Sequence, residues 1–185
     1  MWTHHVASLA LLLLDNAAAK ASVYHAAQDV TYTGATSDGI ETFYSIPYGQ
    51  DTGGENRFKV PVPYTPEAGS AFDATEPGPK CPQAQSTADS FIPLYLSNVS
   101  DVSEDCLHVN VYRAEGTASD ALLPVMLYIH GGSFIIGSKD ELVTQPGGLI
   151  KQSVKIGQPV IAVNINYRLG GEYRRAERLD TTNVL

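Results

Sequence analysis

Residues 122–138 read LLPVMLYIHGGSFIIGS, and the rest of the chain is best understood from this segment. Its first part, Leu122–Ile129, is apolar on both faces and partly β-branched, which predicts a central strand covered on both sides. The side chains then disappear at Gly131 and Gly132. Glycines at the end of a buried strand let the backbone turn sharply and leave N–H groups without side-chain cover.

Uncovered N–H groups at a strand end suit one kind of chemistry. An oxyanion hole needs fixed donors where negative charge develops on a carbonyl oxygen. His130, Gly131 and Gly132 follow the predicted strand, and His-Gly-Gly after a strand is typical of the backbone donors of α/β-hydrolase esterases. The alternative is a glycine-rich turn with no chemistry.

Length and charge restrict the class of protein. The 185 residues can form one domain with a sizeable core. The net charge of -8 is spread along the chain, which argues against nucleic acid or an anionic membrane as a partner. A soluble secreted protein with an acidic surface explains this charge better.

The N-terminus, residues 1–19, has the pattern of a secretory signal peptide. Val6–Leu14 is an apolar core, and Ala17–Ala19 offers small residues for cleavage, although only His4 and His5 precede the core in place of Lys or Arg. The apolar run is too short to span a bilayer, so an uncleaved anchor is the lesser alternative. We therefore expect a secreted, extracellular protein with no stable membrane anchor.

The chain contains two cysteines, Cys81 and Cys106. An even number of cysteines in an exported chain favours one disulfide, and two buried free thiols are the alternative. Asn98 begins an Asn-Val-Ser tripeptide between them, which has the form of an N-glycosylation acceptor.

Two short segments rich in Thr, Tyr and Ile, Asp29–Gly34 and Ile40–Ile46, predict an antiparallel hairpin around the turn residues Thr36–Gly39. The following segment, from Pro47 to about Pro93, is dense in proline with little periodicity, and its aromatic residues favour a packed surface wrap.

Three further elements are predicted downstream. Leu107–Tyr112 alternates, with apolar residues at Leu107, Val109 and Val111, and predicts a strand that buries this apolar face. A short helix is expected from about Leu149, and Pro159–Tyr167 reads as the last strand. A strand, a helix and a strand imply a right-handed crossover, with parallel pairing between this last strand and the one before His130.

Several segments together resemble the type-B carboxylesterase/lipase family, the cholinesterase-like branch of the α/β-hydrolases. They occur in the family's order between Asp29 and Gly170. His108 stands where the family usually has an aromatic residue. The segments are Ile46–Gly49, Asn56–Lys59, Gly78–Gln83, Glu104–Tyr112, the His130-Gly131-Gly132 motif and Val163–Gly170.

The resemblance implies the N-terminal part of an α/β-hydrolase fold and a carboxylic ester hydrolase that acts on small-molecule or lipid esters without a cofactor. It also implies a Cys81–Cys106 disulfide. Oxyanion donors would be the N–H groups of Gly132 and Ser133, with Gly131 as the turn residue and Ser133 standing where glycine is common.

By the same analogy, Phe134 and the Ile135-Ile136 pair would line an acyl or alcohol pocket; ordinary core packing is the alternative.

The remaining catalytic groups of this family are not recognisable. Its chemistry needs a G-x-S-x-G serine followed by an acid and a histidine, and the sequence contains no such motif. The nearest match, Gly131–Ile135, fails at its last position. We read His130 as the motif histidine beside the donors, with no role as a general base. No His/Cys cluster has metal-ligand spacing, and no glycine loop would cradle a phosphate.

After Gly170 the family-like sequence changes into a charged tail, residues 171–185. We expect residues 20–170 to be the N-terminal part of a carboxylesterase domain and the tail to come from a truncated coding sequence. The chain as written would then lack turnover, and the strand Val160–Tyr167 would lie at an open sheet edge. The alternatives are a non-catalytic cholinesterase-like interaction module or the product of a truncated gene.

Overall fold

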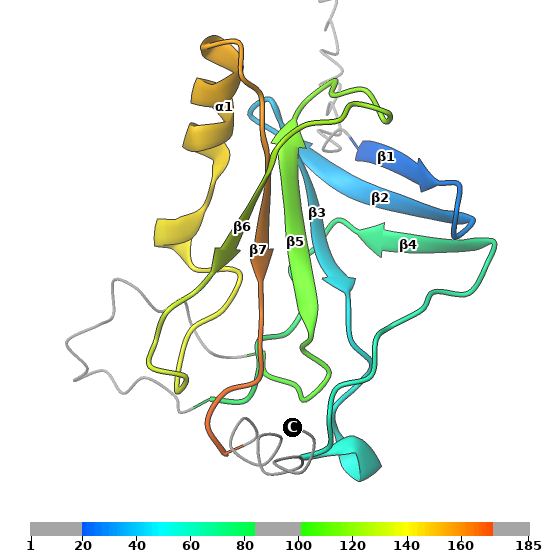
Figure 1. The fold of residues 1–185 in the computed structure, drawn as a ribbon, viewed down its shortest axis with the longest axis vertical. Coiled ribbons are helices and arrows are strands. Elements are labelled where there is room, and N and C mark those ends of the chain that lie inside the picture. Colours follow the sequence, from blue (N-terminus) through cyan, green and yellow to red (C-terminus); the bar gives the residue numbers. More distant parts are fainter. Residues whose placement is uncertain (1–19, 84–100, 172–185) are drawn as a thin grey trace, which may run out of the picture.

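A computed structural model describes residues 20–83 and 101–171 of the chain. The predicted signal peptide, Asn98 and nearly all of the charged tail lie outside these residues. The described part contains seven strands, one α-helix and two 3-10 turns (Figure 1). In chain order they are β1 (Lys20–His25), β2 (Val30–Ser37), β3 (Ile40–Pro47), η1 (Gly54–Asn56), β4 (Ser70–Ala74), β5 (His108–Ala114), β6 (Val125–Ile129), η2 (Leu142–Thr144), α1 (Gly147–Lys155) and β7 (Ile161–Ile165).

All seven strands belong to one mixed sheet with the order β1-β2-β3-β5-β7-β6, and β4 pairs with β2 off this path. The pairs β2/β4 and β6/β7 are parallel, and the other pairs are antiparallel. Strands β1, β2 and β4 run crosswise to β3, β5, β7 and β6, so the sheet has two arms (Figure 1). This mixed sheet, with a helix between two parallel strands, agrees with the α/β class that the sequence predicts.

The predicted N-terminal hairpin is confirmed. Strands β2 and β3 pair antiparallel around Asp38 and Gly39, both of which have a positive φ, at 53° and 74°. Strand β1, which the sequence analysis did not predict, extends the hairpin along the outer side of β2. Its sequence, KASVYH, contains only two strongly apolar residues and gave no clear alternation.

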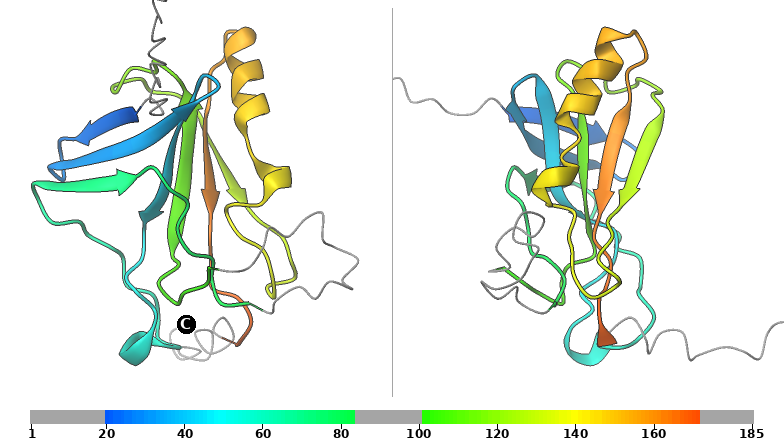
Figure 2. Two further views of the ribbon diagram at one scale, coloured as in Figure 1. Left: turned by 180° about the vertical axis from the view of Figure 1, so that it is seen from behind. Right: turned by 90° about the vertical axis from the view of Figure 1, so that its left-hand side faces the viewer.

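The predicted parallel pairing is also confirmed, because β6 and β7 run side by side from Val125–Ile161 to Ile129–Ile165. Helix α1 connects them and begins at Gly147, two residues before the predicted start. Its fully buried Ile150 packs with Ile40, Tyr112 and Ala162 against one face of the sheet. The helix covers that face in Figure 2.

The opposite face is covered only in part. Phe43 of β3 and Val111 of β5 pack under the crosswise arm, beside Ala21 and Ala74. Strand β6 lies beyond this cover, at the edge of the sheet.

The prediction of a central strand buried on both faces is therefore wrong for β6 within residues 20–83 and 101–171. Its residues Val125, Leu127 and Ile129 are 61%, 54% and 62% exposed. The expected open edge at Val160–Tyr167 is wrong as well, because β7 lies between β5 and β6. An apolar pattern indicates only that burial is favourable. Within the described residues, no segment packs over this side of β6.

Strand β5 has a different orientation from the predicted one. The side chains of His108, Asn110 and Tyr112 are buried, whereas Val109 and Val111 are only half-buried. The side chain of Asn110 stabilises this orientation. Its Oδ1 accepts the N–H of Ser45 at 3.0 Å, and its Nδ2 donates to Tyr112 Oη at 3.1 Å and to Asp140 Oδ1 at 2.7 Å. Alternation alone identified the strand but not its buried face.

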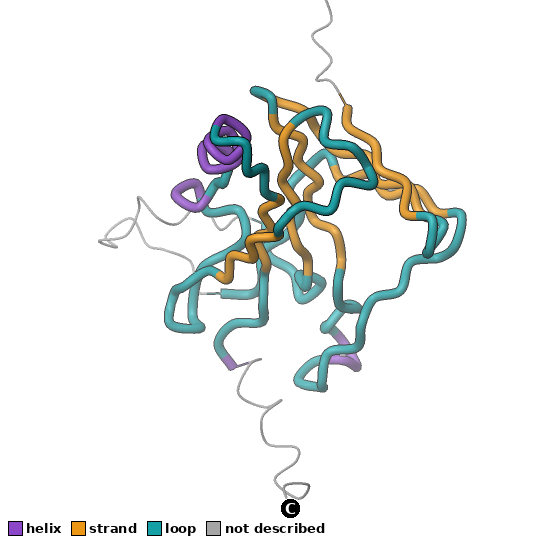
Figure 3. Tube along the Cα trace, turned by 45° about the horizontal axis from the view of Figure 1, so that its top comes forward, coloured by secondary structure: helices purple, strands orange, loops and turns teal. Residues whose placement is uncertain are grey.

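The proline-rich segment after β3 contains more regular structure than predicted, namely η1 and β4. Beyond these elements, long loops gather at the end of the sheet where β3, β6 and β7 finish (Figure 3). The His-Gly-Gly motif lies in one of them, at the carboxyl end of β6. In open α/β sheets this end of the parallel strands is where ligands bind.

Candidate oxyanion site

The turn after β6 has an unusual backbone. Gly132, Ser133 and Phe134 have φ angles of 117°, 55° and 59°, all in the left-handed region. These angles begin at Gly132, so the turn lies one residue later than Gly131, where the prediction placed it. A Cβ atom on Gly132 would lie 1.9 Å from the carbonyl oxygen of Ile136, whereas one on Gly131 would meet nothing within 4 Å. Glycine is therefore required at position 132 and is unnecessary at position 131.

The turn is closed by its own backbone. The N–H groups of Ile135 and Ile136 both donate to the carbonyl oxygen of Gly132, at 2.9 and 3.2 Å. The carbonyl oxygen of Phe134 accepts the N–H of Gly170 at 2.6 Å, which ties the turn to the segment after β7.

The two predicted donors lie in this turn, outside the sheet. Strand β6 ends at Ile129, so neither Gly132 nor Ser133 takes part in a strand ladder. Within residues 20–83 and 101–171, their N–H groups have no hydrogen-bond acceptor. Two successive N–H groups of this turn are therefore left without a partner in the described part of the chain.

His130 is held rigidly beneath the turn. Its ring stacks on Tyr167 with a centroid distance of 4.3 Å, and the Tyr167 hydroxyl donates to the His130 carbonyl oxygen at 2.6 Å. Nδ1 lies 2.8 Å from the carbonyl oxygen of Gly131, which can only accept, so Nδ1 carries the proton. Burial lowers the pKa of His130, against smaller opposing effects of the Gly131 hydrogen bond and the Glu141 charge. A neutral, buried ring of this kind suits a structural role.

A cleft of about 510 Å³ opens beside the turn. Its walls are mostly apolar, and Gly131 also lines it. Ile135, which the resemblance placed in a pocket, is instead 55% exposed to solvent. Six residues of the wall are Tyr48, Ile129, His130, Ser133, Phe134 and Tyr167. The His130 and Ser133 of the predicted site thus share one cavity with an aromatic surface that the sequence analysis assigned only in part.

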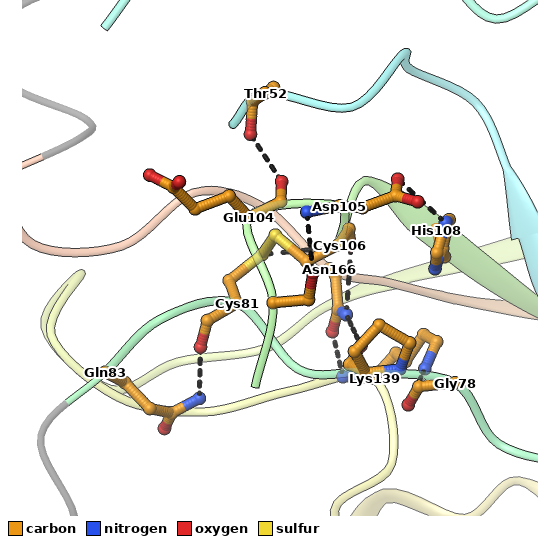
Figure 4. The surroundings of a disulfide bond; sticks show 12 residues. Thr52, Gly78, Cys81, Gln83, Glu104, Asp105, Cys106, His108, Lys139 and Asn166 are labelled. Atoms are coloured by element: carbon orange, nitrogen blue, oxygen red, sulfur yellow. Dashed lines mark hydrogen bonds and ion pairs between the residues drawn. A yellow bond between two sulfur atoms is a disulfide. The ribbon is translucent and has the colours of Figure 1, made fainter. Parts of the chain in front are cut away.

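Behind the turn lies a disulfide, between Cys81 and Cys106, which confirms the predicted pairing. Both cysteines are buried and pack with Leu107 and Leu169; we call these four residues the disulfide corner. Asn166 connects its segments (Figure 4): its amide donates to the carbonyl oxygens of Pro79 and Cys106, both at 3.1 Å, and its side-chain oxygen accepts the N–H of Lys139 at 2.8 Å.

The segment that follows the turn is anchored by a buried ion pair. Lys139 is fully buried, and its Nζ lies 2.7 Å from Asp140 Oδ2. Burial lowers the pKa of Lys139, and Asp140 opposes this effect. Asn164 of β7 donates to the carbonyl oxygen of Lys139 at 3.2 Å. Contacts with β5 and β7 therefore fix the end of the loop that carries the turn.

Several residues of this arrangement had no assigned role in the sequence analysis, among them Tyr167, Asn166 and Gly137. The first two lie in the family-like segment Val163–Gly170, which was used only for the resemblance. Gly137 was visible as the next glycine after the motif, and it has a φ of 118° in the structure. Its contact with His130 depends on the fold of the turn and could not be read from spacing.

A sequence profile of the carboxylesterase family matches residues 28–171. The chain belongs to this family. It is 45% identical over 142 residues to an inactive carboxylesterase-like protein, VdtD, of Byssochlamys spectabilis, and this match covers 75% of the chain and 23% of that protein. It is 42% identical over 154 residues to a secreted lipase of Arthroderma benhamiae, covering 83% of the chain and 26% of the lipase.

Solved carboxylesterase structures agree with the fold. A thermophilic PNB esterase superposes with a TM-score of 0.65 at 36% identity, over 80% of this chain and 28% of the esterase. The chain thus spans about a quarter of the length of the relatives it matches.

The structure shows neither a metal-ligand cluster nor a membrane-spanning helix among residues 20–83 and 101–171. In the part of the chain that it describes, no group of three or more His, Cys, Asp or Glu residues is placed to hold a metal ion. The helices among those residues are all too short or too polar to cross a bilayer.

Proposed function

We propose that this chain is the oxyanion-binding part of a secreted carboxylic ester hydrolase that uses a serine nucleophile. The observation that carries the proposal is the pair of N–H groups at Gly132 and Ser133. They have no acceptor among the described residues, they lie in a left-handed turn, and the turn borders an apolar cleft. Membership of the carboxylesterase family supports the same reaction class.

In this proposal the ester carbonyl lies in the cleft with its oxygen toward Gly132 and Ser133. Attack on the carbonyl carbon moves charge onto that oxygen, and the two N–H groups stabilise it. In comparable sites the loss of one such donor raises the barrier by about 3–4 kcal/mol. Ser133 donates from its backbone, so the serine side chain is not required for this role.

The ester would be a small-molecule or lipid ester with an apolar group. Phe134 and Tyr167 line the cleft, and their rings meet edge to face at 6.0 Å. Mostly apolar walls of this kind suit an acyl chain, and Arg168 is the charged residue of the same lining. The buried disulfide and the similarity to a protein named as a secreted lipase support an extracellular location.

By itself, the 185-residue chain is proposed to have negligible turnover, because its sequence contains no G-x-S-x-G motif. In subtilisin the loss of the nucleophile alone lowers kcat by about 2 × 10⁶. We expect no burst of p-nitrophenol from p-nitrophenyl butyrate and no covalent labelling by an organophosphonate. A stoichiometric burst together with labelling would contradict this part of the proposal.

A second candidate function is a non-catalytic interaction module. The observation that favours it is the 45% identity to a protein named as inactive and carboxylesterase-like. On this alternative the turn geometry would be an inherited feature with no ligand.

The decisive test places the turn in a complete enzyme. Residues 28–171 replace the matching segment of the Arthroderma benhamiae secreted lipase, and kcat is measured with p-nitrophenyl butyrate. We expect hydrolysis by this chimera and a fall in kcat of about 10²–10³ for Gly132→Ala, since the added Cβ must displace the donors. Gly148→Ala, on α1 outside the cleft, adds a Cβ that meets nothing within 4 Å; it is the matched control and is expected to stay within about twofold. A folded Gly132→Ala chimera with unchanged kcat would rule out the oxyanion role.

A further inference from the structure

Gln83 makes a paired contact with the backbone of Gly137. The N–H of Gly137 donates to Gln83 Oε1 at 2.9 Å, and Gln83 Nε2 donates to the Gly137 carbonyl oxygen at 3.0 Å. The second hydrogen of Nε2 goes to the carbonyl oxygen of Cys81 at 3.1 Å. A side-chain amide has two donors and one carbonyl acceptor, so its orientation is fully determined by these three bonds.

Gly137 in turn lies directly against the start of the turn. A Cβ atom at this position would come within 2.4 Å of His130 Nδ1 and 2.7 Å of the carbonyl oxygen of Gly131. The preceding carbonyl, that of Ile136, occupies the space beside Gly132. The two ends of the turn are therefore in contact, and a shift at Gly137 must move Gly132.

From these contacts we infer that Gln83 is a positioning residue for the Gly132 and Ser133 donors. It touches neither the cleft nor a substrate, and it acts by fixing the far end of the turn. Donors in an oxyanion hole must be held within about 0.5 Å of the productive position, which requires such a support. The inference rests on the proposed function of these two N–H groups.

The contact also connects the turn to the disulfide corner. Cys81 lies two residues before Gln83, and the corner is held in turn by Asn166. Gln83 thus links a cross-linked, buried anchor to the loop that carries the Gly132 and Ser133 N–H groups, which have no acceptor within residues 20–83 and 101–171. Replacing Gln83 should loosen the turn while the sheet stays intact.

Residue-resolved amide hydrogen exchange on the full ¹⁵N-labelled chain tests this inference. Gln83→Leu removes the clamp at similar volume, and Gln83→Glu keeps the acceptor for the Gly137 N–H while losing the donors. Gln50→Leu is the matched control, because the Gln50 amide makes only a long, exposed contact of 3.5 Å with Pro63. The reporters are the Ile135 and Ile136 N–H groups, which bond to Gly132.

In Gln83→Leu we expect exchange at Gly137, Ile135 and Ile136 to accelerate at least about tenfold, with the amides of β5 unchanged. Gln83→Glu should recover part of the protection, and Gln50→Leu should match the unmodified chain. Acceleration confined to Gly137, or spread equally over β5, would overturn the inference. Exchange does not depend on catalysis, so a Gly132→Ala chimera that keeps its kcat would reject the proposed function while leaving this result to be judged separately.

Discussion

Two regions near β6 and β7 differ in how far the described part of the chain buries them. The disulfide corner is buried, cross-linked and hydrogen-bonded through Asn166. The outer face of β6, formed by Val125, Leu127 and Ile129, is more than half exposed. The first region draws its partners from four separate segments, whereas the second has apolar side chains that no segment within residues 20–83 and 101–171 covers.

This contrast separates two requirements of the fold. The corner and the turn can be held by contacts within residues 20–83 and 101–171, so the site geometry does not depend on a cover for β6. The exposed face makes a different demand, since a long apolar edge favours association with other chains. Four measurements test whether these two requirements are independent of each other.

Removal of the disulfide should have the largest effect on stability. The double variant Cys81→Ala/Cys106→Ala opens a loop whose ends are 25 residues apart. Loop-closure entropy predicts a loss of about 3–4 kcal/mol in the free energy of unfolding, measured by urea denaturation. A loss smaller than about 1 kcal/mol would mean that the hydrogen bonds of Asn166 alone can hold the corner.

The second largest effect is expected at Gly132. Gly132→Ala places a Cβ where the Ile136 carbonyl oxygen lies and forces alanine to a φ of 117°. We expect a loss of about 1–3 kcal/mol in stability. Gly131→Ala meets nothing within 4 Å and should change stability by less than about 0.5 kcal/mol. Equal losses for the two variants would contradict the described turn.

The third measurement concerns pH and tests His108, which lies near the corner. Burial lowers the pKa of His108, opposed by the Asp105 charge, and burial also lowers the pKa of His130. Since the unfolded chain binds protons more readily, stability should fall as the pH drops below about 6.5, by at most about 1.4 kcal/mol per pH unit for each histidine.

His108→Phe should remove one of these two contributions and flatten the curve. Unfolding free energies at pH 7.5 and pH 5 for both proteins give the comparison. An unchanged slope would show that His108 is protonated equally in the folded and unfolded chains.

The smallest effect on stability, with a clear effect on association, is expected on the outer face of β6. Leu127→Lys changes a residue that is 54% exposed and should alter the free energy of unfolding by less than about 0.5 kcal/mol. The same change should reduce self-association in sedimentation velocity, because charge on an edge strand opposes pairing. Leu149→Lys, at a residue of α1 that is 47% exposed, serves as the matched control. Equal self-association of the two variants would show that a surface other than the outer face of β6 mediates it.

Much of the fold was predictable because it depends on local patterns. The hairpin β2/β3, the parallel pair β6/β7 and helix α1 follow from turn residues and apolar runs. Strands β1 and β4 were missed, since their sequences, KASVYH and SAFDA, contain no apolar run and each takes its place by pairing with β2. The buried face of β5 was assigned wrongly because the three side-chain hydrogen bonds of the buried Asn110 outweigh the apolar alternation.

The candidate site was predictable in its residues and less so in its supports. The glycines, the histidine and the cysteine pair could be recognised from the motif and the family resemblance. The roles of Tyr167, Gly137 and Gln83 depend on contacts between segments more than 30 residues apart in two cases, and a single sequence carries no signal for such contacts. The donor roles of Gly132 and Ser133 themselves stay a proposal.

The late position of Asn166 in the sequence also affects when the disulfide corner can be completed during synthesis of the chain. Asn166 is placed 60 residues after Cys106 and 87 after Pro79, yet it supplies the donors for both of their carbonyl oxygens. As the polypeptide leaves the ribosome from its N-terminus, both cysteines emerge long before Asn166. Oxidation of the thiols can therefore precede the burial of the corner, so a nascent chain can be cross-linked while its future core is still hydrated.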